Sequence, residues 1–169
     1  MIIYHGTNMD FDDIDISKSH KFKDFGTGFY CTTIYEQAKL WAIRRSRTWG
    51  KDAIIISYEF DDSKMAELST QTFNDPTIEW AQMVMNNRNK LFTNHSDPFS
   101  NHDNKYDIVF GPVANADLAE VFDLYVSGRI TLEQLAQNLA FKTDLNDQYS
   151  FHTGKALELL KKIGVEKID

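Results

Sequence analysis

Four short segments of the sequence place polar side chains next to the glycines and aromatic residues that are typical of strand ends. They span residues 4–7, 24–30, 106–114 and 147–153. In the first, His5 follows β-branched residues and directly precedes Gly6, so a short strand is predicted to end in a turn with an imidazole beside it. Such a histidine can bind a ligand hydroxyl, and a purely structural role is the alternative.

The second segment predicts a surface for a flat ligand. Gly26 and Gly28 remove side chains just before Tyr30, so a planar group could approach the backbone and stack on the aromatic ring. The alternative is that Tyr30 is an ordinary half-buried strand aromatic. Trp41 has the same two interpretations, with core packing as the alternative to ligand contact.

Together these motifs resemble the ADP-ribosyltransferase superfamily, in the branch with a His-Tyr-acidic signature that includes diphtheria toxin and the poly(ADP-ribose) polymerases. His5-Gly6-Thr7 is similar to that branch's His-Gly-Ser/Thr, and the segment 26–30 to its Gly-x-Gly-Ile/Val-Tyr. Trp41 stands where a second aromatic residue is usual. The remaining segments resemble a bacterial family of uncharacterised domains in the same superfamily, over nearly the whole chain.

The resemblance implies that the substrate is NAD. By it, His5 would bind a ribose hydroxyl, the backbone of Gly6 would hold the nicotinamide carboxamide, and the rings of Tyr30 and Trp41 would enclose the nicotinamide. Fixing the nicotinamide ring in this way strains and orients the leaving group as positive charge builds on the ribose. The implied NAD-binding set is His5, Gly6, Thr7, Gly28, Tyr30 and Trp41.

The superfamily's last catalytic position departs from its usual pattern here. A glutamate normally begins the final strand of the fold, and the matching residue is Gln148. A glutamine can hydrogen-bond the ribose, but it carries no charge and cannot act as a general base. The resemblance thus gives His5, Tyr30 and Gln148 as the catalytic set. Asp147 offers a carboxylate, but neighbours on a strand face opposite sides, so it is not assigned this role.

The function implied is mono-ADP-ribosyl transfer to an unknown acceptor, since an uncharged Gln148 argues against chain elongation. A bacterial toxin or regulator with a neutralising partner protein follows by analogy alone. An NAD glycohydrolase is one alternative. A catalytically inactive NAD-binding or protein-interaction module is the other.

Several further polar residues have a possible role. The cluster Arg44, Arg45 and Arg47 could contact a pyrophosphate or simply form a solvated helix end. Secondary candidates for the site are His152, Asp107, Arg88 and Asn87. No metal site is expected, because no pair of histidines or cysteines has ligand spacing, and Cys31 is expected to be inert.

The elements that must position these residues are predicted from periodicity and from capping or turn residues. Because strands and helices do not alternate regularly, the fold class is α+β with mainly antiparallel strands. The resemblance further implies two small sheets packed face to face around an NAD cleft, with helices around them. One domain spanning 1–169 is expected. The expected strands are 2–5, 29–33, 53–60, 106–110, 149–152 and 165–168, and the expected helices are 34–49 with Thr33 as N-cap, 75–89, 116–126, 131–140 and 153–162.

Bulk composition narrows the class of protein. With 169 residues and 42% hydrophobic content the chain can bury one core. The net charge of −7 disfavours non-specific binding to nucleic acid. A single cysteine excludes an internal disulfide, and the N-terminus lacks a signal peptide, so a cytoplasmic protein without membrane contact is expected.

Overall fold

The computed structural model describes residues 1–114, 118–139 and 146–168, and it confirms an α+β fold. Its strands are β1 (Ile2–Thr7), β2 (Phe29–Cys31), β3 (Ala53–Phe60), β4 (Thr70–Thr72), β5 (Ile108–Gly111), β6 (Gln148–Phe151) and β7 (Leu160–Ile168). Its α-helices are α1 (Tyr35–Trp49), α2 (Ile78–Arg88), α3 (Leu118–Val126), α4 (Leu132–Leu139) and α5 (Gly154–Leu157). Two 3₁₀ helices span Ile16–Lys18 and Asp62–Glu67.

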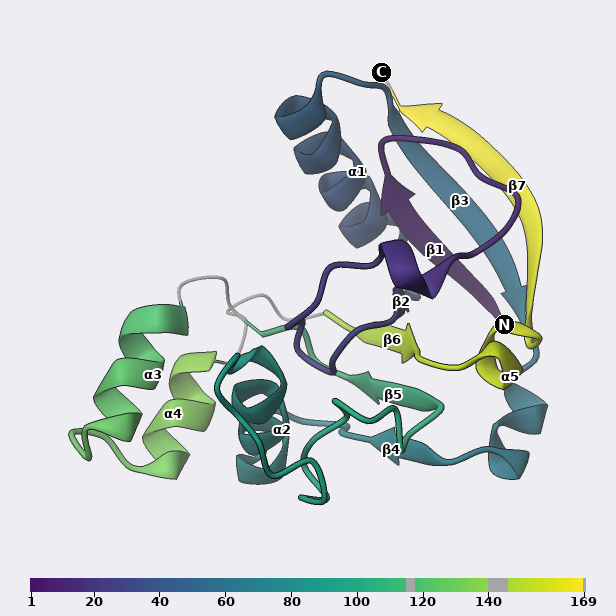
Figure 1. The fold of residues 1–169 in the computed structure, drawn as a ribbon. Helices are drawn as coiled ribbons and strands as arrows, with labels where there is room; N and C mark the ends of the chain where they lie inside the picture. The colour runs from purple at the N-terminus through teal and green to yellow at the C-terminus, as the bar shows by residue number, and fades with distance from the viewer. Residues whose placement is uncertain (115–117, 140–145, 169) are drawn as a thin grey trace.

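Two small sheets form the centre of the molecule, as expected (Figure 1). The first has the order β1-β3-β7 and is antiparallel throughout. The second has the order β2-β6-β5-β4, in which only the pair β4–β5 is parallel. A single antiparallel bridge between Tyr4 and Thr32 joins β1 to the end of β2. The two sheets are therefore tied together beside the first two predicted motifs.

The sheets share a hydrophobic core. Because successive side chains of a strand point to opposite faces, every second side chain points into this core. From the three-stranded sheet come Ile3, Ile56, Tyr58 and Phe60, and from the four-stranded sheet come Phe29, Cys31, Ile108, Tyr149 and Phe151. Burial raises the pKa of the Cys31 thiol well above its ordinary value, which agrees with the prediction that this cysteine is inert.

Helix α1 covers the outer face of the three-stranded sheet (Figure 1). Its buried contacts are the small residues Ala38 and Ala42, which pack against Ala53 and Ile55 of β3. The helix backbone also lies directly over Gly6 of β1, where a Cβ atom would come within 2.9 Å of Ala42 N and closer still to the carbonyl oxygen of Ala38. A small residue on each side thus lets helix and strand approach closely.

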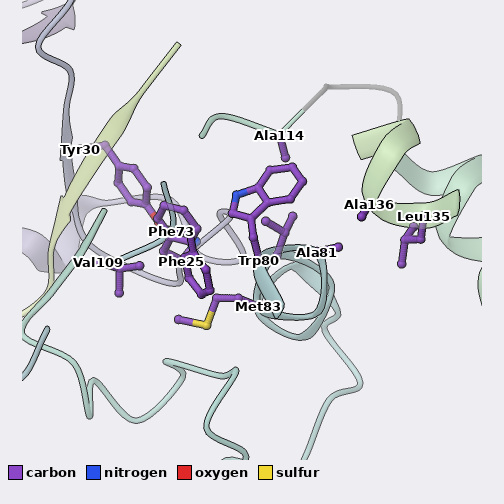
Figure 2. Close-up of a cluster of buried hydrophobic side chains, with 11 residues drawn as sticks. Phe25, Tyr30, Phe73, Trp80, Ala81, Met83, Val109, Ala114, Leu135 and Ala136 are labelled. Carbon is purple, nitrogen blue, oxygen red and sulfur yellow. The ribbon is translucent and has the colours of Figure 1, made fainter. Parts of the chain in front are cut away.

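A second core lies between the four-stranded sheet and the helices α2 and α4. Figure 2 shows Trp80 of α2 at its centre, with Phe25 and Tyr30 on one side and Leu135 of α4 on the other. The indole nitrogen of Trp80 donates a hydrogen bond to the carbonyl oxygen of Pro112 (3.1 Å). Tyr30 is therefore part of a packed core, as its alternative interpretation proposed.

The strand predicted at 165–168 is confirmed within β7, but the helix predicted before it was too long. A helix was expected from 153 to 162 with Gly164 as its breaker, but α5 ends at Leu157 and β7 begins at Leu160. Gly164 lies inside β7 opposite Ser57, next to a shift of register between Ser57 and Tyr58. Pairing with the whole of β3 outweighs the helix propensity of the Leu- and Lys-rich segment, a tertiary effect that local propensity does not contain.

Two predicted helix starts also differ. The N-cap of α1 is Ile34, without a side-chain cap, because the hydroxyl of Thr33 bonds the carboxylate of Asp147. Helix α2 begins at Ile78, two residues after Pro76, because the side chain of Thr77 caps it by accepting from Trp80 N. The predicted helix residues 116, 117 and 140 lie outside the described residues, and β4 was not predicted.

Among the described residues, no helix is both long and apolar enough to span a bilayer.

The close approach of α1 to β1 makes Gly6 a position where added volume is costly. The variant Gly6→Ala should lower the free energy of unfolding by about 1–3 kcal/mol, because the methyl group meets backbone that cannot rotate away. Urea unfolding followed by circular dichroism measures this. The matched control is Gly154→Ala, whose methyl group enters open space. Equal stability of the two variants would contradict the packing described here.

Candidate functional site

A pocket of about 270 Å³ opens where α1, β1, β2 and β6 converge with the loop that precedes β2. Five residues that the sequence singled out line it together, although they lie up to 143 positions apart: His5, Gly6, Tyr30, Trp41 and Gln148. The other lining residues are Lys23, Asp24, Arg44, Arg45, Arg88 and Val113. The tertiary structure thus gathers most of the predicted set around one hollow.

A second pocket of about 210 Å³ adjoins the first and shares His5, Lys23, Tyr30 and Arg45 with it. The two remaining predicted residues, Thr7 and Gly28, line this second pocket and not the first. Its wall includes the apolar side chains Phe11, Ile14, Ile16 and Phe29. The predicted residues therefore divide between two adjoining pockets that meet at His5 and Tyr30.

The imidazole of His5 is held in one orientation. Its Nδ1 lies 2.7 Å from the carbonyl oxygen of Tyr30, and because a carbonyl can only accept, Nδ1 carries the proton. The ring packs on Phe29, with centroids 4.4 Å apart. Burial, helped by the nearby charges of Lys23 and Arg45 and opposed by the hydrogen bond to Tyr30, lowers the pKa of His5 to about 4. His5 is consequently neutral at pH 7, with the lone pair of Nε2 as its remaining hydrogen-bonding group.

Gly6 presents its backbone to the first pocket. The backbone N–H of Tyr4 donates to the carbonyl oxygen of Thr32 (2.8 Å), and its C=O accepts from Thr32 N (2.9 Å). Both backbone groups of Tyr4 therefore point away from β3. In an antiparallel ladder this direction alternates, so the N–H and C=O of Gly6 point to the same edge as those of Tyr4. Among the described residues no strand continues the pairing beyond Thr32. The N–H donor and the C=O acceptor of Gly6, two residues past the bridge, therefore face the edge of the pocket.

Tyr30 has its hydroxyl engaged in the protein. The hydroxyl donates to the carbonyl oxygen of Gly26 (2.7 Å) and accepts from Phe25 N (3.1 Å). Burial raises the pKa of this phenol well above its ordinary value. The side chain is only 6% exposed, and the ammonium of Lys23 sits over its ring, 4.3 Å from the centroid. Since its hydroxyl is engaged, the group that Tyr30 can offer a ligand is its ring, and Lys23 lies over that ring.

Trp41 is partly buried and lines the pocket from α1. In the described part of the chain its indole forms no ring pair, with Tyr30 or with any other aromatic residue. The enclosure of a flat ring between Tyr30 and Trp41 stays a prediction.

The buried carboxylate of Asp24 holds several parts of the site together. Its Oδ1 accepts from Arg88 Nε at 2.7 Å, and a second guanidinium nitrogen of Arg88 contacts the same oxygen. Its Oδ2 accepts from Gln148 Nε2 (2.7 Å) and from Ala114 N (3.0 Å). The sequence analysis did not select Asp24 as a site residue, although it stands just before the glycine segment, two residues ahead of Gly26. Arg88, a secondary candidate, enters the site through this contact.

This network sets the orientation of the Gln148 amide. Its Nε2 donates to Asp24 and also to the carbonyl oxygen of Pro112 at 3.2 Å, and both partners accept only. In the described residues no donor reaches Oε1 of Gln148. Since this residue lines the pocket, the group it offers to a ligand is an oxygen acceptor, the same group that a carboxylate would offer, without the charge.

Comparison with known proteins places the chain in a family. Residues 1–162 match the model of a family described as protein of unknown function DUF3990. The chain belongs to the DUF3990 family. The match extends from β1 into β7 and so contains every residue that lines the two pockets. No curated protein and no solved structure matches this DUF3990 chain.

In this DUF3990 domain, Asp147 and the secondary candidates Asp107 and Asn87 hold the structure and do not line the first pocket. The carboxylate of Asp147 accepts from Thr32 Oγ1 (2.6 Å) and Thr33 N (2.9 Å), so it fastens β6 to the start of α1. Asp107 accepts from Ser69 N and from Thr153 Oγ1. Asn87 accepts from Asn101 N (2.8 Å).

His152 is also a structural residue of the domain. Its Nδ1 lies 2.9 Å from the carbonyl oxygen of Thr27 and its Nε2 lies 2.9 Å from Ser150 Oγ. Burial lowers its pKa to about 4. A Cβ atom on Gly28 would come within 2.7 Å of this imidazole. The packing of His152 therefore accounts for the glycine at 28 without a ligand.

The arginine cluster divides. Arg44 and Arg45 line the first pocket, and Arg45 lines the second as well, whereas Arg47 lines neither. The interpretation of a purely solvated helix end is too simple for Arg45, which is partly buried. In the part of the chain that is described, no group of three or more histidine, cysteine, aspartate or glutamate residues could hold a metal ion.

Removal of the Asp24 charge should be costly. Asp24→Asn leaves the mostly buried Arg88 guanidinium without its anionic partner, and we expect the free energy of unfolding to fall by about 2–4 kcal/mol. Chemical denaturation measures this. The control is Asp52→Asn, because Asp52 pairs with Lys167 at a site where both side chains are more than half exposed. A loss no larger than the control's would contradict an anchoring role for Asp24.

The two buried histidines predict acid sensitivity. The folded-state pKa values of His5 and His152 are about 4, below the ordinary value of 6.5, so the unfolded chain binds more protons as pH falls. Stability is therefore complete above pH 6.5 and is lost on the way to pH 4, by about 2 kcal/mol for each histidine between pH 7 and pH 5. Urea titrations across this range measure the slope. His152→Gln should show a shallower one, and an unchanged slope would argue against a buried neutral His152.

Proposed function

We propose that this domain binds NAD and transfers its ADP-ribose group once to an acceptor. The observation that carries the proposal is the convergence of His5, Gly6, Tyr30, Trp41 and Gln148 on one pocket. The sequence motifs that carry the resemblance contain these same residues. An unrelated fold would have no reason to gather residues from β1, β2, α1 and β6 in this way.

Each group in the pocket suits one part of the NAD molecule. The free N–H and C=O of Gly6 match a primary carboxamide, which has both an acceptor and a donor. The ring faces of Tyr30 and Trp41 suit the nicotinamide ring. His5 Nε2 and Gln148 Oε1 are acceptors for ribose hydroxyls. The chain thus supports recognition of the nicotinamide riboside half.

The chemical step breaks the bond between the ribose C1 and the nicotinamide nitrogen. The bonding electron pair leaves with nicotinamide, positive charge develops on the ribose, and the acceptor then bonds C1 and releases a proton. Gln148 Oε1 would hold the ribose hydroxyl and direct a dipole at the developing charge. Among the described residues that line the first pocket, Asp24 is the one carboxylate, and it is engaged by Arg88, Ala114 and Gln148. Repeated chain growth, which needs a free general base, is therefore not proposed.

The same observation favours a second candidate. With Asp24 engaged and Gln148 uncharged, the pocket could bind NAD without cleaving it, as a binding or interaction module. A glycohydrolase differs from the transferase only in the acceptor, which would be water. Product analysis separates all three.

The test is incubation of the purified protein with NAD, with free nicotinamide measured by chromatography. We expect release by the wild type, and a loss of about 100-fold in His5→Ala because the ribose is no longer positioned. Gln148→Ala should lose about 10- to 100-fold, the value of one hydrogen bond of about 1.5–3 kcal/mol. His95→Ala and Gln137→Ala, which change exposed residues outside both pockets, are the matched controls.

The outcomes are distinct. Release of nicotinamide with ADP-ribose as the product indicates the glycohydrolase, and release with a labelled acceptor indicates the transferase. If NAD raises the melting temperature but no nicotinamide appears, the binding module is correct. If NAD causes no release of nicotinamide and no thermal protection, NAD is excluded as the ligand.

A further inference from the structure

Lys23 occupies the place where the two pockets meet. It lines both of them, together with His5, Tyr30 and Arg45. Its ammonium lies over the Tyr30 ring, 4.3 Å from the centroid, and both residues line the two pockets. A planar ligand cannot stack on this face until the lysine moves away.

The backbone on either side of Lys23 is fixed, so only its side chain can move without a larger rearrangement. Phe22 has a left-handed backbone conformation, with φ of 60°, and its ring packs near His102. Asp24 is held by Arg88, Ala114 and Gln148. The movable element is therefore the four-carbon stem of Lys23 and its ammonium group.

The ammonium is held loosely for a partly buried charge. In the described part of the chain Lys23 forms no ion pair within 4 Å; its ammonium lies over the face of Tyr30, and the charge of Asp24 attracts it from farther away. Burial, and then the charge of Arg45, lowers the pKa of Lys23 to about 8. A cation over an aromatic face gains less than it would from a phosphate, which supplies both charge and hydrogen-bond acceptors.

The cationic side chains of the first pocket favour the binding of an anion. Lys23, Arg44 and Arg45 all line the first pocket, and within the described residues no carboxylate pairs with their side chains. This concentration of positive charge occurs in a chain whose net charge is −7. Repulsion between Lys23 and Arg45 is relieved when an anion enters between them.

We propose that Lys23 covers the Tyr30 ring until a phosphate group of the ligand draws its ammonium toward Arg45, so that a phosphate-bearing ligand uncovers its own stacking surface. The proposal rests on the proposed function for the use of that surface by nicotinamide. It assigns a phosphate-binding site to Lys23, Arg44 and Arg45. It also makes the domain selective for dinucleotides over free nicotinamide.

The wild-type protein tests this without any substitution. Nicotinamide and inorganic pyrophosphate are titrated separately and together by calorimetry. Because pyrophosphate relieves a contact of about 1–2 kcal/mol, saturating pyrophosphate should strengthen nicotinamide binding by about 5- to 30-fold. Independent or competing binding of the two probes would overturn the proposal.

A charge-removing variant tests the same contact from the other side. Lys23→Met keeps a long apolar stem, so it should bind nicotinamide more tightly than the wild type and pyrophosphate more weakly, each by about 5-fold or more. The control is Lys21→Met, which removes an exposed charge two residues away and should change neither affinity. Loss of both affinities, or of neither, would overturn the covering role.

The two proposals fail separately. Release of nicotinamide from NAD by the wild type decides the proposed function alone. If the wild type cleaves NAD but the two probes bind independently, the covering role of Lys23 is wrong and the function stands. If pyrophosphate binds through Lys23 but nicotinamide binds neither the wild type nor Lys23→Met, with or without pyrophosphate, the covering role of Lys23 fails and the release assay still decides the proposed function.

Discussion

The carboxylate of Asp24 is the interaction on which the arrangement of the site depends. It is 4% exposed and joins the loop before β2 to α2, to β6 and to the segment after β5. A buried carboxylate is tolerable only when its oxygens are fully bonded, so Arg88, Ala114 N and Gln148 are held in place together. The same bonds direct the amide of Gln148, so a structural anchor also determines which atom the pocket presents.

The second constraint is where the two sheets separate. Tyr4 and Thr32 pair once, and beyond this bridge β1 continues along β3 without a partner on its other edge. Among the described residues, this separation leaves Gly6 without a strand partner on the edge that faces away from β3, and it creates the space that Trp41 and Arg45 line from α1. Close packing of α1 on Gly6 holds the helix near that space. The pocket is thus a consequence of sheet divergence as much as of side-chain choice.

Charge adds a functional bias to this geometry. Although the chain is acidic, Lys23, Arg44 and Arg45 line one pocket. Burial and the charge of Arg45 lower the pKa of Lys23 there. His5 is kept neutral by the same surroundings, so it can accept a hydrogen bond from a hydroxyl without adding another positive charge. A neutral acceptor beside Lys23, Arg44 and Arg45, which form no ion pair within the described residues, supports the proposal of a ligand that carries both hydroxyl and phosphate groups.

The sequence alone determined what is local. Turn glycines, strand formers and an apolar period placed His5, Tyr30 and most elements correctly, because these features depend on neighbouring residues. Only the tertiary structure decided the rest. Pairing with β3 made residues 160–168 a strand, Thr33 bonded Asp147 instead of capping α1, and Asp24 and Lys23 entered the site. These outcomes depend on partners distant in the chain, and a local pattern carries no information about which distant groups will meet.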